Sequence, residues 1–259
     1  MKYAIFTVVI KRIVSLSKKK QMLYIAFVFF ALNFSSVLFF DLGFFRSVRL
    51  TTTISALLYL YSAIKCDQKW IYFVFWTLIA SDISLLFYES LLGPWFYLGS
   101  SIVAYLVLSA IVFNKIEWKR IAWLDYTIYM VMFFFNMYIL YYTLNDINAI
   151  FESKWLYNLI FTTGALGVVM CLLSAFVNVT RPTVPTEYFM YVTFGLVISN
   201  FVALLAYYYD LFTQILYFIE RGAYLFGLFF LVRYAYILQM DGRSTTKEAI
   251  RSSQDSVSH

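Results

Sequence analysis

The sequence has few charged residues, few cysteines and almost no histidine, and each shortage excludes a class of protein. Charged residues make up 13% of the 259 residues, whereas about a quarter is typical of a soluble domain, so the chain is not a soluble globular protein. Its two cysteines lie in a loop and in an apolar run, and they give neither a disulfide framework nor metal-ligand spacing. The single histidine is the last residue. We therefore expect no metal site, and we expect no cofactor.

Apolar residues are abundant instead. The chain is 63% hydrophobic and 22% aromatic, and its mean hydropathy is +0.76. Runs of about 20 mostly apolar residues alternate with short polar loops, a pattern typical of membrane-spanning helices and not of a β-barrel. We predict an all-α fold, a polytopic membrane bundle of about eight helices that occupies residues 21–240 as one domain. The predicted spans are residues 21–40, 49–64, 70–88, 95–113, 122–144, 155–177, 187–207 and 211–236.

The basic residues indicate how the chain crosses the membrane. They gather in residues 11–20, in the loops 65–69 and 115–120, and in the tail, whereas the opposite turns carry chiefly Arg46, Arg49 and Lys154. Because loops rich in Lys and Arg stay in the cytoplasm, we expect an even number of spans with both termini cytoplasmic, in a plasma or inner membrane. Residues 1–20 then form a basic interfacial segment, and the polar residues 241–259 form a flexible tail. This placement explains the net charge of +6 without a nucleic-acid partner.

Ionisable residues inside the apolar runs are the candidate functional groups. Asp82 lies in the middle of the third predicted span, where a charge costs at least ~3 kcal/mol and usually has a function. Asn200 takes the corresponding place in the seventh span, and Glu220 and Arg221 lie within the eighth. At a rise of 1.5 Å per residue these groups share one layer, roughly 10 to 15 Å below the outer surface. Glu89, seven residues after Asp82, would point toward the mouth of a pocket.

Two further readings of these residues stay open. In the first, Asp82 or Glu220 pairs with Arg221 and only fixes the packing of the helices. In the second, the chain is a parallel repeat of two four-helix halves, a device known from membrane proteins. Its basis is the pairing of Ser81-Asp82 with Ser199-Asn200 and of Ala104-Tyr105 with Ala223-Tyr224.

Several short motifs follow one another along the chain: Thr51-Thr52-Thr53, Ser81-Asp82 with Leu85, Gly99 with Tyr105, Met170, Gly195 with Ser199-Asn200, and Tyr224. Their order resembles that in the YhhN family of membrane proteins, the lysoplasmalogenases. The chain departs from the family where a second aspartate is Asn200, where the fourth span has no histidine, and where Gly227-Leu228 replaces Ala-Gln. The resemblance implies a membrane hydrolase of lipid metabolism that cleaves the vinyl ether of a lysophospholipid into a fatty aldehyde and a glycerophospho head group.

The resemblance also implies roles for particular residues. Asp82 would supply the acid that protonates the enol ether, and Glu220 would replace the charge that Asn200 lacks. These three are the candidate catalytic residues, and the candidate substrate-binding residues are Glu89, Tyr105, Arg221 and Tyr224. The expected partner is a membrane lipid or lysophospholipid. The alternatives are a non-enzymatic protein that binds or senses a lipid or small ligand, and a small transporter. A retinal protein is excluded because no predicted span carries a central lysine.

Overall fold

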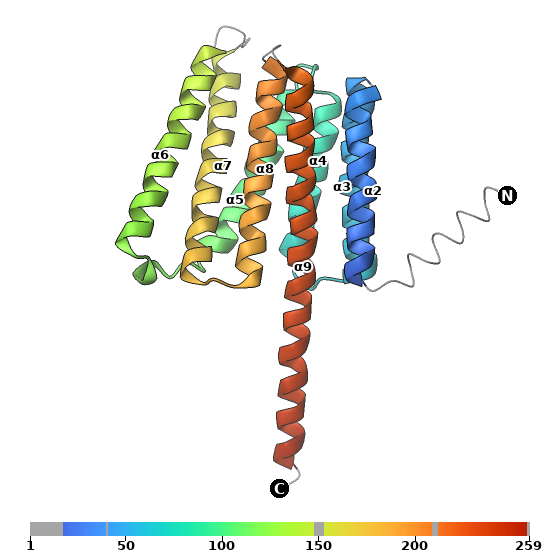
Figure 1. Cartoon of the computed structure of the whole chain (residues 1–259), viewed down its shortest axis with the longest axis vertical. Coiled ribbons are helices and arrows are strands. Elements are labelled where there is room, and N and C mark those ends of the chain that lie inside the picture. The colour runs from blue at the N-terminus through green and yellow to red at the C-terminus, as the bar shows by residue number, and fades with distance from the viewer. Residues whose placement is uncertain (1–17, 40, 148–152, 209–211, 258–259) are drawn as a thin grey trace, which may run out of the picture.

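The computed structural model describes residues 18–39, 41–147, 153–208 and 212–257, and these residues form an all-α bundle (Figure 1). The predicted basic segment lies almost entirely outside the described residues. Successive helices run antiparallel along the bundle and are joined by short connections. The helices are α2 (Lys18–Phe39), α3 (Leu42–Tyr59) with its π-helical extension η1 (Leu60–Ile64), α4 (Lys69–Leu86), α5 (Gly93–Phe113), the short η2 (Trp118–Arg120), α6 (Trp123–Asp146), α7 (Lys154–Thr180), α8 (Val184–Tyr208) and α9 (Thr213–Val257).

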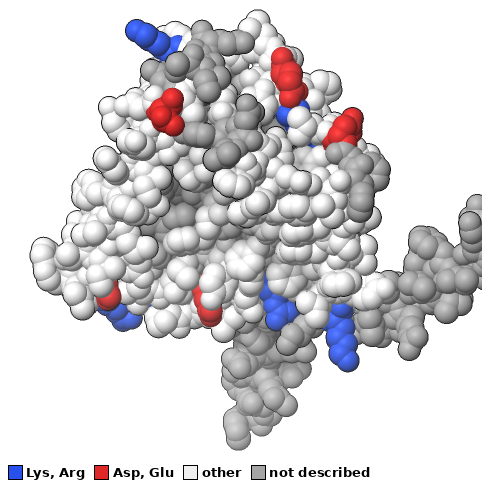
Figure 2. Space-filling view, turned by 45° about the horizontal axis from the view of Figure 1, so that its top comes forward, with Lys and Arg blue, Asp and Glu red and all other residues white. Residues whose placement is uncertain are grey.

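Seven of these helices are long and apolar enough to cross a membrane, and α3 is the one that does not qualify. Hydrophobic side chains cover much of the outer surface, above all on α6, in which few residues are buried. On the face shown in Figure 2, the charged residues lie near the two ends of the bundle, and a broad uncharged band separates them. This arrangement fits a bilayer around the bundle, with charges in the aqueous regions on either side.

The second helix begins earlier than the sequence analysis predicted. The side chain of Asp41 accepts a hydrogen bond of 2.9 Å from the backbone N–H of Phe44, so Asp41 is the N-cap and α3 begins at Leu42. The predicted outer turn of residues 41–48 is therefore wrong. Arg46, which we placed in that turn, and Arg49, which we placed at the outer edge of the second span, lie inside the helix and are buried. They occupy one face of α3 because they are three residues apart.

The helices α8 and α9 approach each other closely at two glycines. A Cβ atom added to Gly195 would lie 2.7 Å from the backbone nitrogen of Gly227 and 2.8 Å from its Cα. The two backbones are therefore in direct contact, as small residues allow between membrane helices. This contact holds the helix that carries Glu220 against the helix that carries Ser199.

Both ends of the described chain lie at the same end of the bundle. In Figure 1, α2 starts and α9 leaves at the bottom, as an even number of passes requires. Helix α9 then continues to Val257, through the segment for which the sequence predicts a flexible tail. Which side of the membrane this end faces stays a prediction, and so does the parallel repeat.

Candidate functional site

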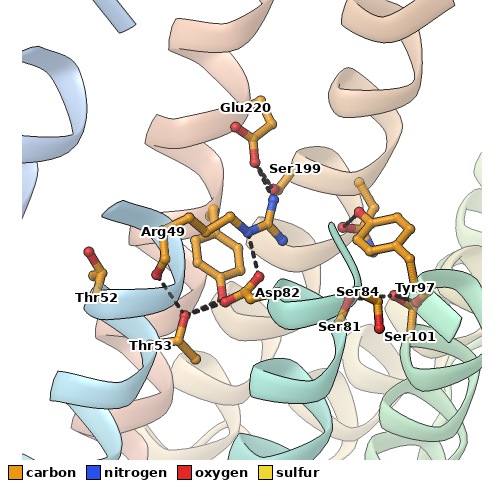
Figure 3. Close-up of polar contacts among 12 residues, drawn as sticks. Arg49, Thr52, Thr53, Ser81, Asp82, Ser84, Tyr97, Ser101, Ser199 and Glu220 are labelled. Atoms are coloured by element: carbon orange, nitrogen blue, oxygen red, sulfur yellow. Dashed lines mark hydrogen bonds and ion pairs between the residues drawn. The ribbon is translucent and has the colours of Figure 1, made fainter. Parts of the chain in front are cut away.

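Arg49 of α3 joins the two buried carboxylates of the bundle (Figure 3). Its Nε donates a hydrogen bond of 2.7 Å to Oδ1 of Asp82, and its Nη1 donates one of 2.5 Å to Oε1 of Glu220. The three side chains are only 3%, 1% and 2% exposed, respectively. The guanidinium carbon also lies 3.8 Å from the centre of the Tyr224 ring. One side chain therefore connects α3, α4 and α9.

Asp82 is fully engaged in this network. Its Oδ2 accepts hydrogen bonds from the hydroxyl of Thr53 at 2.5 Å and from the hydroxyl of Tyr224 at 2.7 Å. Its other oxygen accepts from Arg49. Such a set of donors satisfies a buried carboxylate without a ligand. Asp82 is thus held on all sides by the protein.

Glu220 is engaged less completely. Its Oε1 accepts from the hydroxyl of Ser199 at 3.2 Å in addition to Arg49, while its Oε2 has no hydrogen-bond partner among the described residues. The Nε of Arg221 lies 3.5 Å from Oε2. Arg221 itself donates to the backbone carbonyl of Phe45 at 3.0 Å, and its guanidinium lies over the Phe45 ring.

The charges of this network balance. Asp82 and Glu220 carry two negative charges, and Arg49 and Arg221 carry two positive charges. Buried ions are tolerated only when they are paired in this way. The reading in which Arg221 alone neutralises these carboxylates is incomplete, because Arg49 contacts both of them at shorter distances.

A cavity of about 220 Å³ lies beside the network. It is lined by residues of α3, α4, α5, α6, α7, α8 and α9, and by Tyr88 in the turn that follows α4. Most of its lining is apolar or aromatic and comes from α6, α7 and α8. Its charged lining residues, Arg46, Arg49 and Glu220, come from α3 and α9. The cavity therefore has one polar side and one apolar side.

Asn200 adds neutral hydrogen-bonding groups to the cavity. Its carbonyl oxygen accepts from the hydroxyl of Tyr97 at 3.1 Å, and its amide nitrogen donates to the hydroxyl of Tyr105 at 2.5 Å. All three residues line the cavity. The amide satisfies two tyrosines at once because it both donates and accepts, whereas an ionised aspartate at this position would only accept.

A second ion pair lies where the cavity approaches the end of the bundle. Arg46 donates from Nη1 to Oε2 of Glu89 and from Nη2 to Oε1, each at 2.7 Å. Arg46 lines the cavity and its side chain is 7% exposed, whereas the side chain of Glu89, in the turn after α4, is 56% exposed. Hydrogen bonding to Arg46 holds the pKa of Glu89 below its usual value.

The structure brings the predicted site residues together only in part. Asn200, Tyr105 and Glu220 line the cavity, and Asp82 and Tyr224 lie in the buried network behind it. Glu89 is reached through Arg46, and Arg221 is not among the residues that line the cavity.

The sequence analysis missed three residues of the site, Arg46, Arg49 and Tyr97. The signal that would have revealed the arginines is the capping aspartate, since a helix that begins after Asp41 aligns Arg46, Arg49 and Thr53 on one face. Tyr97 had no such signal in a chain with 23 tyrosines.

The fold and this site together define the class of the protein. It is a multi-pass integral membrane protein in which a charge-balanced network lies beside a half-polar cavity. No family model, no curated protein and no solved structure matches the chain. The YhhN assignment stays a resemblance, and function must be argued from the site itself.

Proposed function

We propose that the protein binds a single-chain amphiphile, a membrane lipid or lysophospholipid in class, in the cavity between α3 and α8. The observation that carries the proposal is the division of the cavity lining. Arg46, Arg49, Glu220 and Asn200 supply charged and hydrogen-bonding groups, whereas α6 and α7 supply an apolar wall. A largely apolar pocket with a few convergent polar groups is the usual form of a site for a small ligand.

The placement of the polar groups supports a defined orientation of the ligand. The polar end would lie against α3 and α9, and the hydrocarbon chain would lie against Leu140 of α6 and Ile160 of α7. Burial of the chain against this wall would contribute about 0.8 kcal/mol per methylene group when the ligand comes from water.

Binding can be tested with a variant that fills the cavity. Ala203 lines it, so we expect Ala203→Trp to weaken binding of a lysophospholipid by about tenfold or more, a loss of about 1.4 kcal/mol or more. Ala110→Trp is the matched control, because Ala110 is exposed on the outer face of α5. Purified protein in nanodiscs and a fluorescent lysophospholipid would give the affinities, with gel filtration as the check on folding. Equal affinity for wild type and Ala203→Trp would exclude this cavity as the site.

Hydrolysis of a vinyl ether in the bound lipid is a second candidate. The observation that favours it is that Glu220 lines the cavity and has one carboxylate oxygen without a hydrogen-bond partner among the described residues. Glu220, and not Asp82, would then protonate the enol ether, because Asp82 is bonded to Thr53, Tyr224 and Arg49 and is not among the residues that line the cavity. Water would add to the resulting cation, and the hemiacetal would split into the aldehyde and the glycerophospho alcohol, with return of the proton to Glu220. Asp82 would position Arg49, and Asn200 would orient the ligand. The resemblance to lysoplasmalogenases points to the same reaction.

Release of fatty aldehyde from a vinyl-ether lysophospholipid tests this second candidate. We expect Glu220→Gln to abolish release, Asp82→Asn to reduce it, and Asn200→Asp to increase it. Unchanged turnover in both carboxylate variants would refute these roles. Binding without any aldehyde release by the wild-type protein would leave ligand binding as the function.

A further inference from the structure

Two arginines line the cavity, and they differ in how firmly they are held. Arg49 is paired with Asp82 and Glu220, both buried. If Arg49 turned toward a ligand, Asp82 would lose its counter-charge and Glu220 would keep only Arg221, which leaves one uncompensated charge in a region of low polarity. Arg49 is therefore not available to an incoming ligand.

Arg46 is held by a weaker constraint. Its carboxylate partner among the described residues, Glu89, has a side chain that is 56% exposed. A pair with one half-exposed member is easier to open than a pair buried on both sides, because water can solvate the carboxylate once it leaves the guanidinium. Glu89 can leave Arg46 and remain solvated, whereas Arg46, with 7% exposure, stays at the cavity.

The geometry of the pair shows what would take the place of Glu89. Each terminal nitrogen of Arg46 donates to one oxygen of the Glu89 carboxylate, and both hydrogen bonds are 2.7 Å long. This parallel fork is the arrangement in which a guanidinium recognises a carboxylate or a phosphate. The Glu89 carboxylate therefore occupies the position that a ligand anion would take.

The charge balance favours an anion at the same place. Among the described residues, Arg49 and Arg221 neutralise the two buried carboxylates, so Arg46 carries one excess positive charge at the cavity once Glu89 has left. Tyr207 and Tyr217 line the cavity close to Arg46 and bring aromatic hydroxyl groups to the same end.

We propose that Arg46 is the anion-binding residue of the cavity, that the ligand is a single-chain amphiphile with a carboxylate or phosphate at its polar end, and that Glu89 is an internal competitor that the ligand displaces. This inference rests on the proposed ligand binding and adds the charge of the ligand and the residue that selects it. The polar end lies at the beginning of α3, and the chain extends from there toward α6 and α7.

Equilibrium binding to the full chain in zwitterionic nanodiscs tests the proposal. The probes are a fatty acid, a lysophosphatidic acid and a monoacylglycerol with the same chain, together with inorganic phosphate. We expect the two anionic amphiphiles to bind about 10- to 100-fold more tightly than the neutral one, as charge-assisted hydrogen bonds imply. Inorganic phosphate should bind far more weakly than the lysophosphatidic acid. Equal affinity for inorganic phosphate and for the lysophosphatidic acid would overturn the proposal that the ligand is an amphiphile.

Two variants test whether the preference for anionic amphiphiles depends on Arg46 and Glu89. Arg46→Gln should reduce the affinity for the anionic amphiphiles to that for the neutral one. Glu89→Gln should raise the affinity for the anionic amphiphiles about two- to fivefold, because it removes the competitor, and leave the affinity for the neutral one unchanged. Glu187→Gln is the matched control. Glu187 is an exposed carboxylate in the first turn of α8, away from the cavity, and it accepts a hydrogen bond from the hydroxyl of Tyr191.

The outcomes separate the two proposals. If none of the amphiphiles binds, the proposed function itself fails. If the neutral and anionic amphiphiles bind equally and Glu89→Gln changes nothing, the cavity is a binding site but the role of Arg46 and Glu89 is refuted. Arg46→Lys serves as the second variant if Arg46→Gln does not fold. It keeps the positive charge, so it should retain part of the preference for anionic amphiphiles.

Discussion

Replacement of Arg49 by glutamine removes the cation on which the buried network depends. In the native protein Asp82 and Glu220 are balanced by Arg49 and Arg221. Without Arg49 the network carries one uncompensated negative charge. Oε1 of Glu220 then retains only the hydroxyl of Ser199, at 3.2 Å.

The magnitude follows from the two contacts that are lost. Two unit charges about 4 Å apart attract by about 4 kcal/mol at an effective dielectric constant of about 20, and desolvation offsets much of this attraction. Removal of one partner of a buried ion pair costs about 3–5 kcal/mol, because the other partner stays buried without its counter-charge. We expect Arg49→Gln to lower the free energy of unfolding by this amount.

A second substitution shows whether charge is the cause. Arg49→Gln with Glu220→Gln restores the balance, so the double variant should lose less stability than the sum of the two single variants, by about 1–3 kcal/mol. Unfolding by SDS in mixed micelles, followed by far-UV circular dichroism, gives these free energies. Arg120→Gln is the control, since Arg120 is 69% exposed in its pair with Glu117 and should cost less than about 1 kcal/mol. Additive losses in the double variant, or a loss below about 1 kcal/mol for Arg49→Gln, would refute the reasoning.

Three other predictions concern packing and titration. Gly195→Ala should cost about 1–3 kcal/mol in the same unfolding assay because it separates α8 from α9, whereas Gly99→Ala should cost nothing because open space surrounds Gly99. The ion pair with Arg46 lowers the pKa of Glu89, so it stabilises the fold above the usual value of 4.5 and is lost as the pH falls below that value. The difference in melting temperature between wild type and Glu89→Gln should therefore be present at pH 7 and vanish in acid; a difference that persists there would contradict the assignment. Burial raises the pKa of the Cys66 thiol, so mass spectrometry should show slow alkylation at pH 8 that SDS accelerates, and equal rates with and without SDS would contradict it.

The number and order of the helices could be predicted from the sequence because each depends on local composition. A run of apolar residues must form a helix in a bilayer, where the backbone has no other hydrogen-bonding partner. The predicted starts at residues 70, 122 and 155 therefore agree to within a residue with the observed helix starts at Lys69, Trp123 and Lys154. The largest difference between a predicted and an observed start is at the second helix, which begins at Leu42 and not at residue 49, because its arginines and threonines lower its hydropathy and conceal its first two turns.

For the site, the sequence could predict only the depth of its residues in the membrane. The positions of Asp82, Asn200 and Glu220 along their helices predicted one layer, and in the structure Arg49 contacts both Asp82 and Glu220. Their partners could not be predicted, because a partner depends on how each helix is rotated about its axis and which neighbour it meets. Arg49 is 33 residues from Asp82 and 171 from Glu220 along the chain.

The sequence by itself determined that the chain is an all-α membrane bundle with ionisable groups in its interior, since both follow from composition and spacing. Only the tertiary structure decided that Arg49 contacts and neutralises both carboxylates. It also decided that Asn200 lines a cavity, where it bonds to two tyrosines, and that Arg46 lines the same cavity while its partner Glu89 is exposed. The physical reason is that the energy of a buried charge depends on the groups within a few ångströms of it. In this protein those groups come from helices that are distant in the sequence and meet only in the folded bundle.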